Sequence, residues 1–526
     1  MPTANEDYWN NFNVTDTDVE RLYGSVLEQG QPVLASDLAR QVVDARVRDE
    51  EDRRRRYNAQ TTPYQPKLEY QIGQRVIFSE LHDAQGEVIA IRPGDNPRLP
   101  PFHVITVRFD EDASTREFAA QYDLPHPLNE ERAVAVVTSD LSTEQVLAEY
   151  GDAIENLLVA RLKRDREFVE QRGRWLLRGL LTPVNEYHLN LAEAAIEGEN
   201  RGLTTTEISR QLDLSAEGPK RTTLFFSIEY ALRHDERFVN VGPRGESRWF
   251  LTRLVPAEAR EIPRLLQLAP APATSPALPP ELETAVQDLE GQADVSAPAT
   301  AHAGATPIVT VALTYPHRRA GSLPLTSSLS ALLPESDNPA MLITLIDAAN
   351  GNRFQGWVVR AGNYIVGLKP WYDQRKLNPG ANIQLQRHSE PLTLVIEYQV
   401  QRERSLWVRT ARVQGGQLTF TTEKKPVAHK YDEEMLILIA DQNALDQLHN
   451  TNQANRPLAA LLVEIFPELA KLVPGGRIHA KTLFAAVNFA QRVGPRAVFA
   501  ALAQSSAFVS QGGGYFMMET AGNPVR

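Results

Sequence analysis

The composition of the chain changes sharply between residues 255 and 307, where Ala, Pro, Thr and Ser predominate. Repeated prolines interrupt helices and strands, and the segment has little hydrophobic periodicity with which to build a core. The segment is therefore predicted to be a disordered or semi-extended linker. Such a linker would divide the 526 residues into two halves that fold and move independently.

The absence of cysteine excludes disulfides, thiolate zinc sites, iron–sulfur clusters and cysteine nucleophiles. No apolar run is long enough to span a membrane. The N-terminus is polar and acidic, whereas a signal peptide is basic and then apolar. These features predict a cytoplasmic protein without a membrane partner.

Charge is unevenly distributed along this chain of net charge −11. Residues 1–150 contain 15 Lys and Arg against 27 Asp and Glu, whereas residues 308–422 contain 12 against 7 and residues 456–526 contain 7 against 3. Because phosphates are bound by local basic surfaces, the acidic total does not exclude nucleic acid. If DNA is bound, we expect residues 308–526 to carry most of the affinity.

The first 140 residues predict helices followed by a small barrel. Residues 1–67 show apolar residues at helical spacing on both sides of a break at Gly30. Residues 68–140 contain short alternating segments separated by turn residues, which favour antiparallel strands. The order of these segments resembles SH3-like barrels of the Tudor, KOW or CarD type. Such barrels bind proteins as well as nucleic acids, so both kinds of partner stay open.

Residues 141–254 predict a helical connector over 141–182 and then three helices with a two-stranded hairpin over 185–252. Thr204 and Glu207 form a capping box that opens the second helix. The layout and the phrase RFVNVGPRGESRWFL resemble winged helices of the HARE type and of the RNA polymerase delta subunit.

This resemblance implies that the third helix enters a DNA major groove and that the hairpin, or wing, follows the backbone. The expected contacts are Lys220, Arg221, Thr222 and Thr223 on the helix and Arg244 and Arg248 on the wing. Many winged helices contact proteins instead. Residues 151–254 contain 16 basic and 16 acidic side chains, so charge does not decide between the two partners.

Residues 308–422 contain seven strand-like runs, which predict a β-barrel or sandwich. Their rhythm resembles the pseudobarrel DNA-binding domains of plant proteins and restriction enzymes. Cations beside aromatic residues could contact phosphates and stack on bases. The candidates are Arg360, Lys369, Trp371, Arg375 and Lys376. In the alternative interpretation, the aromatic residues are core and the arginines reach past them to solvent.

Residues 423–526 show periodic helices and then a glycine-turned hairpin, which resembles a second winged helix. Lys481, Arg492 and Arg496 would form its basic surface. The stretch Gly475–Thr482 is one residue away from a phosphate-binding loop, but it follows a helical pattern where such a loop needs a strand. The match is therefore interpreted as chance. No histidine pair with metal-ligand spacing occurs, so no metal or cofactor is predicted. No GxSxG, Ser-x-x-Lys or GxGxxG motif occurs either, so no enzyme activity is predicted, and a nuclease or nucleotide-dependent enzyme with degenerate motifs is the third alternative.

Together these patterns predict a multi-domain α+β protein that combines winged helices with small antiparallel β-barrels. The expected function is that of a non-catalytic bacterial protein that binds duplex DNA or proteins of the transcription machinery. The alternative is a protein-binding adaptor in a larger complex that makes no direct DNA contact.

Overall fold

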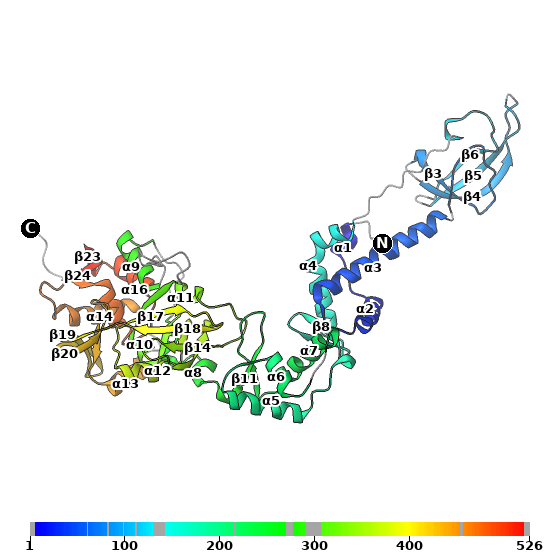
Figure 1. Cartoon of the computed structure of the whole chain (residues 1–526). Helices are drawn as coiled ribbons and strands as arrows, with labels where there is room; N and C mark the ends of the chain where they lie inside the picture. Colours follow the sequence, from blue (N-terminus) through cyan, green and yellow to red (C-terminus); the bar gives the residue numbers. More distant parts are fainter. Residues whose placement is uncertain are drawn as a thin grey trace, which may run out of the picture. The chain divides into compact units, whose positions relative to one another are not determined.

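In a computed structural model of the chain, the described residues are 6–59, 61–81, 84–97, 99–110, 113–129, 142–214, 217–269, 277–290, 307–452 and 456–519. They form helices and several separate sheets, which confirms the multi-domain α+β class (Figure 1). The chain divides into two compact units, Met1–Pro183 with Ser215–Ser227 and Val184–Leu214 with Ile228–Arg526. The boundaries fall after Pro183, after Leu214 and within helix α7 (Pro219–Arg233), and none of them lies in the predicted linker. None of the described helices is both long and apolar enough to cross a bilayer.

In the sequence, the helices of the first unit lie before and after the strands of the barrel. They and their hairpin are α1 (Glu6–Asn10), α2 (Asp16–Gln29), β1 (Val33–Leu34), α3 (Ala35–Ala59), α4 (Thr143–Leu162), β7 (Phe168–Gln171) and β8 (Arg174–Leu177). Helix α4 packs on α3, and β1 pairs with β8. Residues 1–67 and 141–182, predicted to be separate, therefore belong to one structure.

The predicted connector helix over 141–182 is wrong in its second half. Helix α4 ends at Leu162, and strands β7 and β8 form an antiparallel hairpin. The hairpin turns at Arg172 and Gly173, whose φ angles are 55° and 73°. Two consecutive positive φ angles suit the tight turns of two-residue hairpins, and glycine adopts them without strain. This turn accounts for the end of the helical pattern.

The barrel is a five-stranded sheet with the order β2-β3-β4-β5-β6. Its strands are β2 (Thr61–Pro63), β3 (Arg75–Phe78), β4 (Ala84–Pro93), β5 (His103–Phe109) and β6 (Thr115–Ala120). Two backbone hydrogen bonds join the segment after β6 to the segment between β2 and β3. Gln121 N donates to Leu68 O, and Tyr122 N donates to Pro66 O. These bonds nearly close the sheet around an apolar interior that includes Val76. Residues 130–140 of the predicted barrel domain lie outside the described residues.

Residues 186–251 have the predicted three helices and hairpin. The elements are α5 (Glu186–Glu199), β9 (Leu203–Thr204), α6 (Thr205–Gln211), α7, β10 (Phe238–Asn240) and β11 (Arg248–Leu251). The capping box is confirmed, because Glu207 N donates to Thr204 Oγ1 at 3.2 Å and Thr204 N donates to Glu207 Oε2 at 2.8 Å.

The described part of the segment 255–307 differs from the predicted linker. It contains α8 (Ala257–Arg260) and α9 (Pro280–Glu290). Leu282, Ala285 and Val286 of α9 are buried in the core that the C-terminal helices share. Their helical spacing supplies an apolar face that the abundance of Ala and Pro conceals. Residues 270–276 and 291–306 lie outside the described residues.

Residues 308–398 form a seven-stranded sheet with the order β12-β17-β18-β14-β15-β16-β13. The strands are β12 (Ile308–Ala312), β13 (Ser322–Pro324), β14 (Met341–Asp347), β15 (Arg353–Val359), β16 (Tyr364–Val366), β17 (Asn382–Arg387) and β18 (Thr393–Tyr398). Helices α10 (Tyr315–Ala320), α11 (Ser327–Ala331) and α12 (Lys369–Arg375) interrupt them. The last two strand runs predicted for this barrel, within 400–422, leave the sheet. They belong to β19 (Val400–Gln414) and β20 (Gln417–His429), which form a separate sheet with β21 (Ile437–Ile439).

The C-terminal part contains the predicted helices and hairpin. Its elements are α13 (Gln442–Asn452), α14 (Leu458–Ala470), β22 (Ile478–His479), α15 (Ala480–Val487), α16 (Pro495–Gln504), β23 (Phe508–Gly512) and β24 (Tyr515–Met518).

Three parts of the chain share the order helix, short strand, helix, helix, hairpin. In each, the short strand pairs with the second hairpin strand: β1 with β8, β9 with β11, and β22 with β24. The short strand places an apolar residue opposite a buried aromatic one, in the pairs Val33–Trp175, Leu203–Trp249 and Ile478–Phe516. The barrel is inserted between the second and third helices of the first copy. The sequence patterns predict the second and third copies, whereas the first copy was not predicted.

Candidate nucleic-acid interface

The residues predicted to contact DNA from α7 do not all face solvent. Lys220, Arg221 and Thr222 are exposed, and the Arg221 guanidinium lies 5.1 Å from the centre of the Phe225 ring. Thr223 is buried, and its hydroxyl donates to Gly30 O at 2.8 Å. Thr223 therefore has a structural role, and its assignment as a DNA contact is wrong.

The wing arginines Arg244 and Arg248 are already paired with carboxylates. Arg244 Nη1 lies 2.5 Å from Glu335 Oε2, and its Nη2 lies 2.6 Å from Asp337 Oδ1. The hydrogen bond that Arg244 donates to Asp337, and then the charges of both acids, raise the pKa of Arg244. Arg248 Nη2 lies 2.9 Å from Glu246 Oε1. A phosphate that approached either arginine would have to displace a carboxylate.

Most candidates between residues 360 and 376 are buried or form an ion pair with a carboxylate. Trp371 is only 5% exposed, so its predicted role in base stacking is wrong and the alternative interpretation as a core residue is confirmed. Arg375 lies 4.8 Å from the centre of the Trp371 ring and forms a buried ion pair with Asp347. Lys369 Nζ lies 3.3 Å from Asp373 Oδ2.

The two remaining candidates in this region differ from each other. Arg360 donates from Nη1 to Ser330 Oγ at 2.8 Å and from Nη2 to Pro334 O at 2.7 Å. Lys376 ends α12 with a φ of 50° and is exposed.

Of the C-terminal candidates, Arg492 is buried, so its assignment to a basic surface is wrong. The other two are paired with acids. Lys481 Nζ lies 3.3 Å from Asp432 Oδ2, and Arg496 Nη1 donates to Glu283 Oε2 at 3.0 Å. Glu283 belongs to α9, which packs on α16, the third helix of the last copy. The face of α16 that carries Arg496 is therefore covered by a helix of the segment predicted to be a linker.

The ribbon formed by β19 and β20 is basic and exposes a tryptophan, and none of its residues belongs to the predicted site. The two strands pair antiparallel from Arg404–Val427 to Gln414–Gln417, and Gly415 and Gly416 make the turn with φ angles of 59° and 78°. Trp407 on β19 is 71% exposed. Its cross-strand partner is Lys424.

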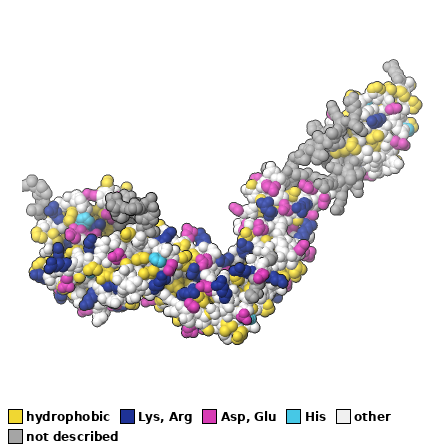
Figure 2. Space-filling view, viewed as in Figure 1, with side chains coloured by type: hydrophobic (Ala, Val, Ile, Leu, Met, Phe, Trp, Pro, Cys, Tyr) yellow, Lys and Arg dark blue, Asp and Glu magenta, His cyan; other side chains and the backbone are white. Residues whose placement is uncertain are grey.

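The ribbon concentrates positive charge. Residues 400–430 contain seven Lys and Arg against two Asp and Glu, in a chain whose net charge is −11. Glu423 pairs with Arg412 and Lys425, and Arg409 pairs with Glu434. Among the described residues, Arg402, Arg404, Lys424 and Lys430 are exposed and form no ion pair. Figure 2 shows Lys and Arg side chains gathered where Figure 1 places β19 and β20.

The rest of the ribbon is anchored in the protein interior. Near its turn, Ala411, Leu418 and Phe420 are buried in the core of the C-terminal helices. Farther along, Val408 and Val427 form a second small core with residues that flank and belong to β21. Because buried residues hold the ribbon at two places, the exposed Trp407 and Lys424 are presented from a fixed support. The sequence signal was present as two long runs joined by two glycines, but it did not reveal which face stays exposed.

Comparisons with protein-family models, with curated proteins and with solved structures found no match. Within the part of the chain that the structure describes, no cluster of His, Asp and Glu could hold a metal ion.

Proposed function

We propose that this protein binds duplex DNA without catalysing a reaction, and that the β19–β20 ribbon is its principal contact. The observation that carries the proposal is the exposed Trp407 beside Lys424 in a strongly basic ribbon. A two-stranded ribbon fits the major groove of B-form DNA, and lysine and arginine side chains neutralise phosphates. A tryptophan exposed at such a surface contributes flat contact area against bases or sugars.

The test removes the three unpaired cations nearest Trp407 from the full-length chain, by the substitutions Arg402→Gln, Arg404→Gln and Lys424→Gln. Binding of a fluorescent random-sequence duplex is measured by anisotropy at several salt concentrations. We expect weaker binding, and a plot of log affinity against log salt that is less steep by about three units, because about three phosphate contacts are lost.

The control removes the same total charge elsewhere in the second unit, through Arg253→Gln, Arg353→Gln and Lys471→Gln. These three side chains are 48%, 53% and 51% exposed, and each already forms an ion pair with a carboxylate. We expect the control to bind DNA as the wild type does. If both variants lose affinity equally, or if the wild type does not bind duplex DNA, the proposal is wrong.

A protein-binding role is the second candidate, and the chemistry of α4 favours it. This third helix of the first copy exposes Glu144, Glu149 and Asp152, which would repel phosphates. An acidic helix suits a basic protein partner instead. Changing Glu149 and Asp152 to Gln should leave DNA binding unchanged and weaken the binding of a synthetic Arg-rich peptide. Peptide binding that does not change would contradict this second role.

A further inference from the structure

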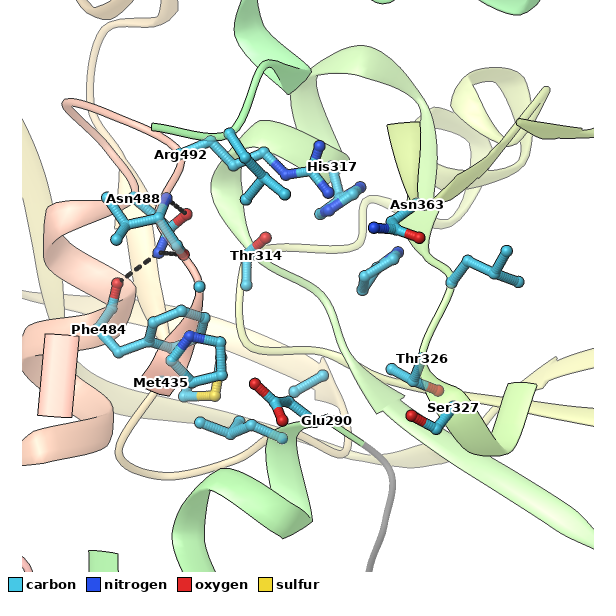
Figure 3. A pocket seen from close by; sticks show the side chains of 18 residues that line it. Glu290, Thr314, His317, Thr326, Ser327, Asn363, Met435, Phe484, Asn488 and Arg492 are labelled. Carbon is cyan, nitrogen blue, oxygen red and sulfur yellow. Dashed lines mark hydrogen bonds between the residues drawn. The ribbon is translucent and has the colours of Figure 1, made fainter. Parts of the chain in front are cut away.

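A cavity of about 310 Å³ lies inside the second unit. Its wall comes from parts far apart in the chain: Leu268, Leu289 and Glu290, then residues within 312–327 and within 484–495, together with Asn363 and Met435. Figure 3 shows that Arg492 and His317 lie side by side at one end, whereas Glu290 lies at the other. The volume lies at the lower end of the range of sites that bind small molecules.

Arg492 is a buried cation without a carboxylate partner among the described residues. Its side chain is only 6% exposed. The hydrogen bonds that hold it leave from Nη1 and end on two backbone carbonyls, Leu266 O and Gly362 O, the latter at 3.3 Å. Burial lowers the pKa of Arg492 to about 10, although the charge of Tyr364 opposes the shift. A guanidinium in this position is stabilised when an anion enters the cavity.

The groups beside Arg492 are suited to an anion. Burial, and then the charge of Arg492, lower the pKa of His317 well below 6.5, so its ring is neutral. Its Nδ1 lies 2.9 Å from Ser322 Oγ, which fixes the ring at the edge of the cavity. Thr314 precedes α10 but its side chain makes no capping hydrogen bond, and Figure 3 shows its hydroxyl at the cavity wall. These side chains can donate hydrogen bonds to an oxyanion.

The loop that carries Arg492 is held in place before any ligand binds. Asn488 Nδ2 donates to Phe484 O at 2.9 Å, and its Oδ1 accepts from Val493 N at 3.3 Å. Ala269 N donates to Arg492 O at 3.0 Å. Because these bonds fix the backbone on both sides of the side chain, little conformational entropy remains to be lost when the cavity is filled.

The opposite end of the cavity restricts what can bind. Burial raises the pKa of Glu290, and the charge of Arg496 acts against that rise. Leu289, Met435 and Phe484 line the wall at this end. A carboxylate there disfavours a second negative charge, whereas the apolar wall suits a short carbon skeleton. The cavity therefore fits a molecule that is anionic at one end only.

We propose that this cavity binds a small metabolite through a single oxyanion, a carboxylate or a phosphate, with Arg492 as its charge partner and His317 and Thr314 as hydrogen-bonding groups. The inference is independent of DNA binding, since none of these residues belongs to the ribbon.

The experiment follows thermal unfolding of the full-length protein with increasing inorganic phosphate, acetate or chloride at constant ionic strength, with isothermal titration to measure affinity. We expect a saturable rise in melting temperature with phosphate or with acetate, and none with chloride. The anion that gives the larger rise identifies the class of metabolite. The variant Arg492→Gln should bind that anion about 10-fold to 100-fold more weakly, because a charge-assisted hydrogen bond is lost.

The matched control is Arg319→Gln, which removes an arginine that already pairs with Asp446 and does not line the cavity. It should respond to anions as the wild type does. If Arg492→Gln does not fold, Thr314→Val, which keeps the shape of the side chain, should weaken binding several-fold. An equal response in the wild type and in the variants would show a general salt effect. That result, or no response beyond chloride, would overturn the proposal.

Discussion

The hairpin β10–β11 and the ribbon β19–β20 belong to the same unit and both carry arginines, but their surroundings differ. In the first, Arg244 lies against Glu335 and Asp337, and Arg248 pairs with Glu246. On the ribbon, Arg402, Arg404 and Lys424 form no ion pair within the described part of the chain. A basic hairpin therefore suits a phosphate only where the protein has not already neutralised its charge.

Length adds to the difference. Strands β10 and β11 have 3 and 4 residues, whereas β19 and β20 have 15 and 13. The short pair is mostly buried, with Trp249, Phe250 and Leu251 in the interior, whereas the longer pair buries Phe420 and still exposes Trp407 in the middle of a strand. Consequently the ribbon combines a rigid base with an accessible Trp407.

The largest effect should follow from removing the anchor of the ribbon. Phe420 is fully buried beside Ala411 and Leu418. Phe420→Ala should reduce the free energy of unfolding by about 3 to 5 kcal/mol, because a large cavity is left in the core. Hydrogen exchange should show that β19 and β20 lose protection while β10 and β11 keep theirs. Equal loss in both hairpins would mean that the ribbon has no separate anchor.

Removing the exposed aromatic ring should have a smaller effect, on binding alone. Trp407→Ala should weaken duplex binding by less than about 1 to 3 kcal/mol, the range for an aromatic ring stacked on single-stranded bases, because the bases of a duplex are already stacked on each other. The salt dependence should not change, because the side chain carries no charge. Tyr187→Ala, which removes another strongly exposed ring, is the control and should bind normally. If Trp407→Ala binds the duplex as tightly as the wild type does, the ring does not contribute to binding and the interface consists of the cations alone.

Local patterns predicted much of the fold. The capping box at Thr204, the barrel strands β3 to β6 and the hairpin β23–β24 follow from residue periodicity and turn residues. These features depend on neighbours a few positions away. They could therefore be located before any tertiary contact was known.

The errors arose where distant segments decide the outcome. Helix α9 is ordered because its apolar face meets the C-terminal helices, a contact that the composition of the Pro- and Ala-rich segment cannot reveal. The hairpin β7–β8 was not predicted, because the helical pattern before it was extended to residue 182.

The candidate site was harder to predict than the fold, because pairing partners lie far away in sequence. Nothing local to Arg244 shows that Asp337 neutralises it, and nothing local to Trp371 shows that the ring is buried. The exposure of Trp407 likewise depends on which half of the ribbon meets the core.

Lowering the pH should destabilise the β19–β20 ribbon slightly more than the hairpin β10–β11. His429 on β20 is buried, and burial lowers its pKa below 6.5, although a hydrogen bond to Lys430 O opposes the shift. Below pH 6.5 the unfolded state therefore binds a proton that the folded state does not. The folded state should lose up to about 1.4 kcal/mol per pH unit from this residue until its folded pKa is reached.

The measurement is the unfolding free energy and the hydrogen-exchange protection of the ribbon between pH 7 and pH 5. His429→Gln should show a weaker pH dependence than the wild type. The buried His317 contributes a similar loss in both proteins and cancels in the comparison. Strands β10 and β11 contain no histidine and should change less. Identical pH profiles for the wild type and the variant would contradict this prediction.

The smallest effect is expected for the hairpin β10–β11, whose arginines have carboxylate partners. Arg244→Gln with Arg248→Gln removes two cations that would contact phosphates if this hairpin followed a DNA backbone. Because Glu335, Asp337 and Glu246 already neutralise them, duplex affinity and its salt dependence should match those of the wild type. Anisotropy titrations beside the ribbon variant make the comparison direct. A loss of about two units in the salt slope would show that DNA displaces these carboxylates, and the hairpin would then belong to the interface together with the ribbon.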